Sequence, residues 1–206
     1  MPILDNIVGD IKQVIAVRTD LGMGKGKIYP ARAASHLLNP LRFLVQPPRR
    51  VIRQMNLSRD HLVLEVGCGP GWFSKVLAAA VPQGHLTICD LQQGMLEIAS
   101  VRLNSFGNFT AVQSDACSMP FADGQFDAIL LSSVLGEFPD KNRCLGECAR
   151  VLSPSGKVTV VETRRDSDFI PQQELIRLAQ SAGLEFFSRS GTRWEYTVNL
   201  RHASGR

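Results

Sequence analysis

The sequence has no apolar run that approaches the roughly 18 to 20 residues needed to cross a bilayer. Its 206 residues are 44% hydrophobic and 20% charged, a balance typical of a soluble globular protein. The opening stretch, MPILDNIVGDIKQ, carries Asp5 and Asp10 where a secretory signal needs a basic start and a continuous apolar segment. We therefore expect one main domain with neither membrane insertion nor export.

Cysteine is scarce, and its count argues against a disulfide framework. The five cysteines are odd in number and irregularly spaced: Cys68, Cys89, Cys117, Cys144 and Cys148. The last two have a spacing compatible with a metal, but a second ligand pair is missing and both fall on the apolar side of a predicted helix. We expect them to pack in the core, and we expect no metal site and a cytoplasmic location.

A strong excess of one charge is also absent. The net charge of +4 does not by itself imply a nucleic-acid partner, which would require a clustered basic face. The nearest approach to such a cluster is Arg49, Arg50 and Arg53, beside Pro47 and Pro48, and we interpret it as the solvated face of a linker. We expect no nucleic-acid partner, and the sequence does not indicate an oligomeric state.

Strand-like and helix-like segments alternate regularly after residue 60. The strand-like runs occupy residues 61–66, 85–90, 108–113, 126–131, 156–162, 184–189 and 193–201. Helical spacing lies between them, as in the set Leu145, Cys148, Ala149 and Leu152. Parallel strands need crossover connections, so this alternation predicts an α/β fold with a seven-stranded, mostly parallel sheet and helices on both faces. Only SGT separates the last two runs, which predicts a hairpin and one antiparallel strand near the C-terminus.

The run VLEVGCGPGWFSKVL passes from a strand to a helix through three glycines, Gly67, Gly69 and Gly71. A dinucleotide-binding fingerprint needs its third glycine one position later, where this chain has Trp72. Glycine permits positive φ and has no side chain, so the loop predicts a close backbone approach to a ligand. The chemistry of that ligand depends on the residues at the ends of the neighbouring strands.

Acidic residues end the next two strands. Asp90 closes HLTICD nineteen positions after Gly71, close to the roughly 20-residue spacing at which a βαβ unit places an acid on ribose hydroxyls. An alternative for Asp90 is to cap the following helix, which Asp does well. Asp115 and Ala116 follow the third strand in FTAVQSDA. Cofactor binding is the interpretation we prefer for Asp90.

These motifs, with MPFADGQFDAILLSSVLGEFPD and CARVLSPSGKVTVVE, resemble the class I S-adenosylmethionine-dependent methyltransferases. The resemblance is closest to the small-molecule branch, the type 11 methyltransferases that include quinone-biosynthesis enzymes, and it covers residues 61–200. It implies a Rossmann-like fold, S-adenosylmethionine as the cofactor and a small-molecule methyl acceptor as the partner. LSPSG departs from the lysine and paired glycines usual in the family, in a loop far from the cofactor. We divide the chain into an extension with a lid-like helical segment, residues 1–60, and a methyltransferase domain, residues 61–206.

The resemblance also implies a role for each residue of the cofactor site. Glu65 would orient the methionine amino group, and Asp90 would bind the ribose hydroxyls. The other implied contacts are backbone lining by Gly67, Cys68, Gly69 and Gly71, packing on adenine by Leu91 and Met95, recognition of the adenine edge by Asp115 and Ala116, and backbone contacts to the methionine end by Ser132.

Methyl transfer from a sulfonium needs alignment and exclusion of water more than it needs a strong base. A phenolic oxygen or a carbon nucleophile would still benefit from one, and the candidates beyond strands four and five are Glu137, Asp140 and Glu162. We choose Glu137 first, with a carboxylate that stabilises a helix dipole as its alternative. Lids of small methyltransferases suggest four further pocket residues, of which His36 is the second catalytic candidate: Tyr29, His36, Asn39 and Arg42.

Residues 12–28, KQVIAVRTDLGMGKGKI, resemble the opening strand and loop of type-two peptidyl-tRNA hydrolases. Nothing downstream continues that resemblance, so we treat it as incidental, and GMGKGKI lacks the spacing of a Walker A loop. The tetrapeptide that amino-methylating enzymes carry after strand four is absent, which disfavours methylation of bases or glutamine. The leading hypothesis is methyl transfer to a small molecule. An RNA-directed methyltransferase and a non-catalytic S-adenosylmethionine-binding module remain as alternatives.

Overall fold

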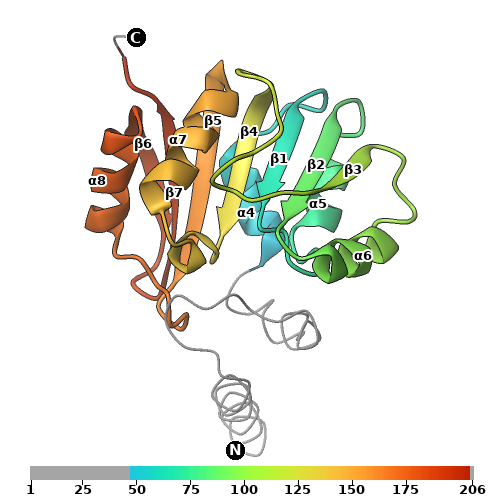
Figure 1. The fold of residues 1–206 in the computed structure, drawn as a ribbon, viewed down its shortest axis with the longest axis horizontal. Coiled ribbons are helices and arrows are strands. Elements are labelled where there is room, and N and C mark those ends of the chain that lie inside the picture. The colour runs from blue at the N-terminus through green and yellow to red at the C-terminus, as the bar shows by residue number, and fades with distance from the viewer. Residues whose placement is uncertain (1–46, 205–206) are drawn as a thin grey trace, which may run out of the picture.

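The computed structural model describes residues 47–204, which form a seven-stranded sheet flanked by helices (Figure 1). The strands are β1 (Leu62–Val66), β2 (His85–Asp90), β3 (Phe109–Gln113), β4 (Phe126–Ser132), β5 (Leu152–Thr163), β6 (Leu184–Gly191) and β7 (Glu195–His202). The helices are α4 (Pro48–Met55), α5 (Ser74–Ala80), α6 (Gln93–Arg102), the 3-10 helix η2 (Leu135–Glu137), α7 (Lys141–Val151) and α8 (Gln172–Ser181). Within residues 47–204, no helix has the length and apolar character required to cross a membrane.

The strands follow the order β3-β2-β1-β4-β5-β7-β6, and the first five strands of the chain pair in parallel. Strand β7 is antiparallel to both β5 and β6, so the prediction of a mostly parallel sheet with one antiparallel strand is confirmed. Strands β2 and β3 lie on one side of β1, and the chain then crosses to the other side of β1, where β4 and the later strands lie. The strand order therefore reverses between β1 and β4. Open sheets of this kind bind ligands beyond the carboxyl ends of the strands at such a switch point.

Both faces of the sheet are covered, because the strands are apolar on both sides. Ile129 and Leu131 of β4 join the core beneath α7 and α8, whereas Leu130 joins the core beneath α4, α5 and α6. Cys144 and Cys148 are fully buried free thiols in the first of these cores, which confirms their expected packing role. No group of metal-binding side chains occurs within the described range.

The prediction that Leu152 belongs to the helix containing Leu145 and Cys148 was wrong. Leu152 begins β5, four residues before the predicted strand, and it pairs with Phe126 across a register shift in β4. Leu152 fits the apolar spacing of the preceding helix, but an apolar residue suits a strand equally well. Its pairing with β4 makes it a strand residue. Gly156 lets this part of β5 pack closely, because a Cβ there would lie 2.7 Å from Leu152 Cδ1.

The basic stretch that we interpreted as a linker forms helix α4. Pro48 occupies its first turn, where a missing N–H costs nothing, and Asn56 ends it in the left-handed region with φ of 51°. Val51 and Met55 are buried in the core shared with α5 and α6, so residues assigned to the N-terminal extension contribute to the main fold. The exposed positions of this helix are Arg49, Arg50 and Arg53.

Candidate cofactor and acceptor site

The glycine loop adopts the backbone conformation that its composition predicts. Gly67, Gly69 and Gly71 have φ values of 65°, 52° and 79°, in the left-handed region that side chains disfavour. The Cys68 N–H donates to Cys89 O at 3.0 Å, which holds the loop against the end of β2. The loop therefore turns sharply at the carboxyl end of β1 and presents backbone to this edge of the sheet.

Two of the glycines also permit close packing within the protein. A Cβ at Gly67 would clash with Cγ2 of Val134, in the segment after β4. At Gly71 it would lie 3.1 Å from Cβ of Ala99 on α6. The loop thus touches the segments that follow β4 and β2, and its position depends on both.

Gly67→Ala is expected to lower the free energy of unfolding by about 1 to 3 kcal/mol, because it combines positive φ with a clash at Val134. Urea unfolding measures this change. Gly146→Ala on α7 is the matched control: nothing lies within 4 Å of its added Cβ, and alanine in a helix should stabilise by about 0.5 to 1 kcal/mol. Equal unfolding midpoints for the two variants would contradict the packing argument.

Glu65 lies beneath the glycine loop as a buried carboxylate. Its side chain is 4% exposed, and the hydroxyl of Ser74 donates to its Oε2 at 2.5 Å. Ser74 is the first residue of α5 and is fully buried. The sequence reasoning did not single out Ser74, although a serine at the start of the helix that follows the glycines was a usable signal.

The Asp90 carboxylate joins the glycine loop to the segment that leads into α6. The Gly69 N–H donates to Oδ2 and the Gln92 N–H donates to Oδ1, each at 2.9 Å. Burial raises the pKa of Asp90, while these backbone bonds oppose that rise. The N-cap of α6 is Gln92, so capping does not explain Asp90. Each oxygen keeps capacity to accept a further hydrogen bond from a ligand hydroxyl.

The residues expected around adenine collect at the ends of β2 and β3. Leu91 is 50% exposed, whereas Met95 in the first turn of α6 is buried. Asp115 is exposed and accepts a bond from the Cys117 N–H at 2.8 Å, and Ala116 is buried beside it. An apolar side chain and a carboxylate thus lie accessible at the same sheet edge as Asp90.

Glu137 and Asp140 occupy different local structures after β4. Asp140 is the N-cap of α7 and accepts from the Arg143 N–H at 2.9 Å, which gives it a structural role. Glu137 is the last residue of the short 3-10 helix η2 and the acidic residue of its first turn, so the helix-dipole alternative stays open for it. Its side chain is half-buried.

Glu162 is the most deeply buried carboxylate at the ends of β4 and β5. It is 1% exposed, and its Oε2 accepts a long bond of 3.4 Å from the Ile170 N–H. Its Oε1 is buried and has no hydrogen-bond partner among residues 47–204. Burial, and after it the neighbouring Asp166, Asp168 and Glu137, raises its pKa to about 8. Such a carboxyl group can exchange a proton near neutral pH.

Two more buried hydroxyls lack a partner among the described residues at this edge. They are Oγ of Ser133 and Oγ1 of Thr163. Ser133 follows β4 with a φ of 51°, and its N–H donates to Val161 O at 2.8 Å, which joins the end of β4 to β5. Ser132, the last residue of β4, is half-buried next to it. Neither Ser133 nor Thr163 was predicted from the sequence, since isolated hydroxyls carry no motif.

The raised pKa of Glu162 predicts a specific dependence of stability on pH. The folded protein retains a proton on Glu162 that the unfolded chain releases near 4.5, so its contribution to stability is complete below pH 4.5 and is lost as pH rises to about 8. The stability of the wild type relative to Glu162→Gln should fall across this window, by up to about 1.4 kcal/mol per pH unit. Urea unfolding of both proteins at several pH values measures the difference, and a constant difference would refute the assignment.

Comparison with known proteins identifies the domain. The family described as "Methyltransferase domain" matches residues 64–160. By this match, residues 64–160 resemble a methyltransferase domain. The demethylmenaquinone methyltransferase of Staphylococcus aureus (strain JH9) is 35% identical over 116 residues, which are 56% of this chain and 48% of that protein. The chain therefore spans about half the length of the curated relatives it matches.

Solved structures support the fold of this methyltransferase domain. A SAM dependent methyltransferase from Aquifex aeolicus has a TM-score of 0.79 at 19% identity, covering 84% of this chain and 98% of that one. A TehB-like SAM-dependent methyltransferase from Corynebacterium glutamicum has a TM-score of 0.67 at 16% identity, covering 85% and 100%. The class I, Rossmann-like architecture expected from the sequence is confirmed. A methyltransferase domain of this class implies S-adenosylmethionine as the cofactor.

Some residues predicted from the sequence lie in the part of the chain that the structure does not describe. Tyr29, His36, Asn39 and Arg42, together with residues 12–28, lie outside the described residues. The acceptor-side candidates that the structure does bring together are Glu137 and Glu162, which are close enough to interact electrostatically. The geometry favours Glu162 over our first choice, Glu137, because Glu162 is the more buried and has an oxygen without a partner in this part of the chain.

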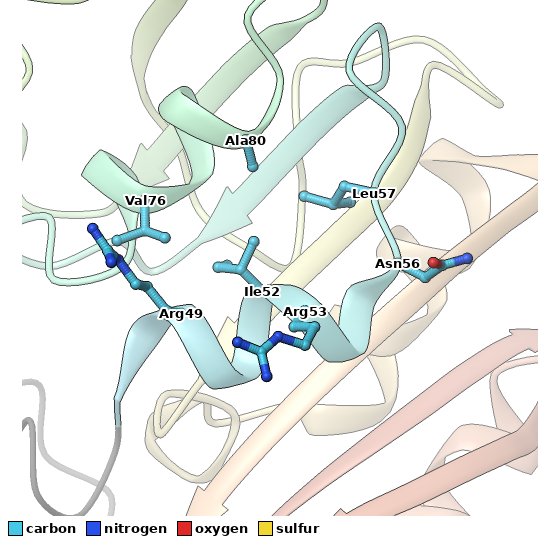
Figure 2. A pocket seen from close by; sticks show the side chains of 7 residues that line it. All are labelled: Arg49, Ile52, Arg53, Asn56, Leu57, Val76 and Ala80. Carbon is cyan, nitrogen blue, oxygen red and sulfur yellow. The ribbon is translucent and has the colours of Figure 1, made fainter.

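A separate groove lies between α4 and α5 (Figure 2). It has a volume of about 360 Å³ and is lined by Arg49, Ile52, Arg53, Asn56, Leu57, Val76 and Ala80. Figure 2 shows Ile52 directed between the two helices, with Arg49 extended toward Val76 and Arg53 beside α4. No residue of the glycine loop lines it, so this groove is distinct from the candidate cofactor site.

Proposed function

We propose that the chain transfers a methyl group from S-adenosylmethionine to a small, partly apolar acceptor by in-line displacement. The observation that carries this proposal is the Asp90 carboxylate, held by the backbone of Gly69 and Gln92 at the carboxyl end of β2. It stands beside a loop of three glycines with positive φ, at the switch point of the sheet. This combination suits an adenosine cofactor with free ribose hydroxyls.

The residues present fit S-adenosylmethionine in both charge and exposure. Asp90 would accept from the ribose hydroxyls, and Glu65 beneath the loop would orient the amino group, directly or through water. Leu91 would cover the adenine ring, with Asp115 at its edge. When bound, the cofactor supplies a methyl group on a positively charged sulfonium, which is already a good leaving group. Backbone from Gly67 to Gly71, Met95, Ala116 and Ser132 would complete the site.

We infer that the acceptor is an aromatic molecule with an ionisable hydroxyl, such as a phenol or a hydroquinone. The name of the Staphylococcus aureus relative specifies demethylmenaquinone as its substrate. In this chain, buried oxygens without described partners on Ser133, Glu162 and Thr163 could meet a polar group at the ends of β4 and β5. Glu162 would accept the proton that the acceptor loses as it becomes nucleophilic. Apart from this proton transfer, the reaction would require only that the acceptor be aligned with the methyl group and that water be excluded.

Two measurements on the full chain test this proposal. Isothermal titration should show binding of S-adenosylmethionine and of its demethylated product, and absence of binding at high protein concentration would refute the cofactor assignment. Transfer of a labelled methyl group should then occur to phenols or hydroquinones but not to tRNA. Tight cofactor binding with no transfer to any acceptor would favour a non-catalytic binding module, and transfer to tRNA alone would favour an RNA-directed enzyme.

A further inference from the structure

Trp194 is exposed where β6 turns into β7, and four arginines belong to the two segments that are bonded together there. Arg189 and Arg193 belong to this hairpin, and Arg164 and Arg165 follow β5; with Trp194 they form what we call the basic tip. Trp194 is 57% exposed, the most exposed aromatic residue among the large exposed hydrophobics of the described chain. A large aromatic ring held in water beside several cations requires an explanation.

Backbone and side-chain contacts hold the two segments of the basic tip together. The Arg164 N–H donates to Trp194 O at 2.9 Å, so the end of β5 is bonded to the hairpin. Arg189 Nη2 donates to Thr192 O at 2.9 Å, which draws its guanidinium toward the turn. The Arg193 guanidinium lies 5.0 Å from the centre of the Trp194 ring. Arg189 and Arg193 thus lie at the turn that carries Trp194, and the backbone of Arg164 is bonded to it, with the Arg164 guanidinium 5.4 Å from the centre of the Phe169 ring.

The positive charge of the basic tip is not neutralised by ion pairs within residues 47–204. None of its four arginines forms a salt bridge with another residue of that range. The same two segments contain the acids Asp166, Asp168 and Glu195; the last two are buried, and burial raises the pKa of Glu195. Arg50 of α4 adds a further cation on the side of Glu195. The exposed surface is thus cationic around an apolar ring.

The basic tip adjoins the proposed acceptor side of the methyltransferase site. Arg164 and Arg165 begin the loop that returns to Glu162 through the Ile170 N–H, and Tyr196 of β7 donates to Ile170 O at 2.7 Å. Figure 1 shows the β6–β7 turn and the loop after β5 at the same end of the sheet. Any surface that the tip contacts is therefore brought close to the carboxyl ends of β4 and β5.

We propose that the basic tip docks the protein on an anionic phospholipid surface. Arginines near such a surface gain electrostatic attraction, and a tryptophan suits the boundary between headgroups and acyl chains. A projecting turn favours a membrane over a nucleic acid, because bases stack within grooves or on sheet platforms. The proposal also accounts for an apolar acceptor, and in that respect it rests on the proposed function. Docking would set the site next to the lipid phase from which such an acceptor comes.

Sedimentation with vesicles tests the proposal on the full chain. Vesicles of phosphatidylcholine with about one quarter phosphatidylglycerol should bind the protein at low salt, and vesicles of phosphatidylcholine alone should not. Arg165→Gln with Arg193→Gln should weaken binding more than tenfold, since each arginine contributes about fivefold. Arg59→Gln with Arg177→Gln removes the same charge from exposed positions elsewhere and should change binding by less than threefold.

Fluorescence provides an independent readout, because the other tryptophan, Trp72, is buried. Anionic vesicles should shift the emission to shorter wavelength, and Trp194→Phe should abolish the shift. Equal weakening by the two arginine pairs, or no binding at low salt, would overturn the proposal. Retention of RNA through the tip without vesicle binding would also overturn it, in favour of a nucleic-acid surface. Titration with S-adenosylmethionine separates the docking proposal from the proposed function. Cofactor binding without vesicle binding would refute docking and leave the proposed function standing.

Discussion

Asp90→Ala is expected to weaken the binding of S-adenosylmethionine about 100-fold, measured by isothermal titration. Two hydrogen bonds from the ribose hydroxyls to a carboxylate would be lost, at about 1.5 kcal/mol or more each. The substitution also frees the N–H groups of Gly69 and Gln92, which the carboxylate holds at 2.9 Å. Part of the loss should therefore come from a looser glycine loop.

Asp127→Ala is the matched control for this experiment. Asp127 also accepts from a backbone N–H, that of Leu62 at 2.9 Å, but it does so at the start of β4, at the opposite end of the sheet. Its loss should lower the free energy of unfolding and leave the cofactor dissociation constant within about threefold. Asp90→Asn, which keeps one acceptor oxygen, should fall between the wild type and Asp90→Ala. Wild-type affinity in Asp90→Ala would remove the central observation behind the proposed function.

Glu162→Gln is expected to lower the rate of methyl transfer by about 100-fold or more, with little change in cofactor affinity. A general base must be ionised, so the wild-type rate should fall as pH drops below about 8, the raised pKa of this buried carboxyl. The variant has no such group and should lose this limb of the pH profile. Rates measured over a pH range from roughly 6 to 9.5 on phenolic acceptors provide the test.

Two further variants separate the chemical role of Glu162 from its contact with the 163–171 loop. Tyr196→Phe removes the bond to Ile170 O but keeps the carboxylate, so it should retain most of the activity and the same pH profile. Glu137→Gln should alter the rate by less than tenfold if Glu162 is the base. A full loss in Glu137→Gln together with an active Glu162→Gln would return the assignment to Glu137, the choice that sequence reasoning favoured.

The cofactor half of the site was the more predictable half. Its residues lie in contiguous stretches that end parallel strands, and the carboxyl ends of such strands meet at one edge of the sheet. The proposed acceptor half combines Glu162, Ser133 and Thr163, which stand out only through burial and through oxygens without partners among the described residues. Neither property has a local signature. For the same reason Asp140 looked like a candidate base, although it caps α7.

The order of apolar and glycine-rich segments by itself determined the sheet, its one antiparallel strand and the glycine turn before α5, because these depend on periodicity and on backbone conformation. Only the tertiary structure decided that Leu152 belongs to a strand, that the arginines of α4 stand on a packed helix and that Glu162 holds its proton near neutral pH. Those outcomes depend on ladder pairing, packing and desolvation between segments far apart in the chain, and no local pattern encodes them.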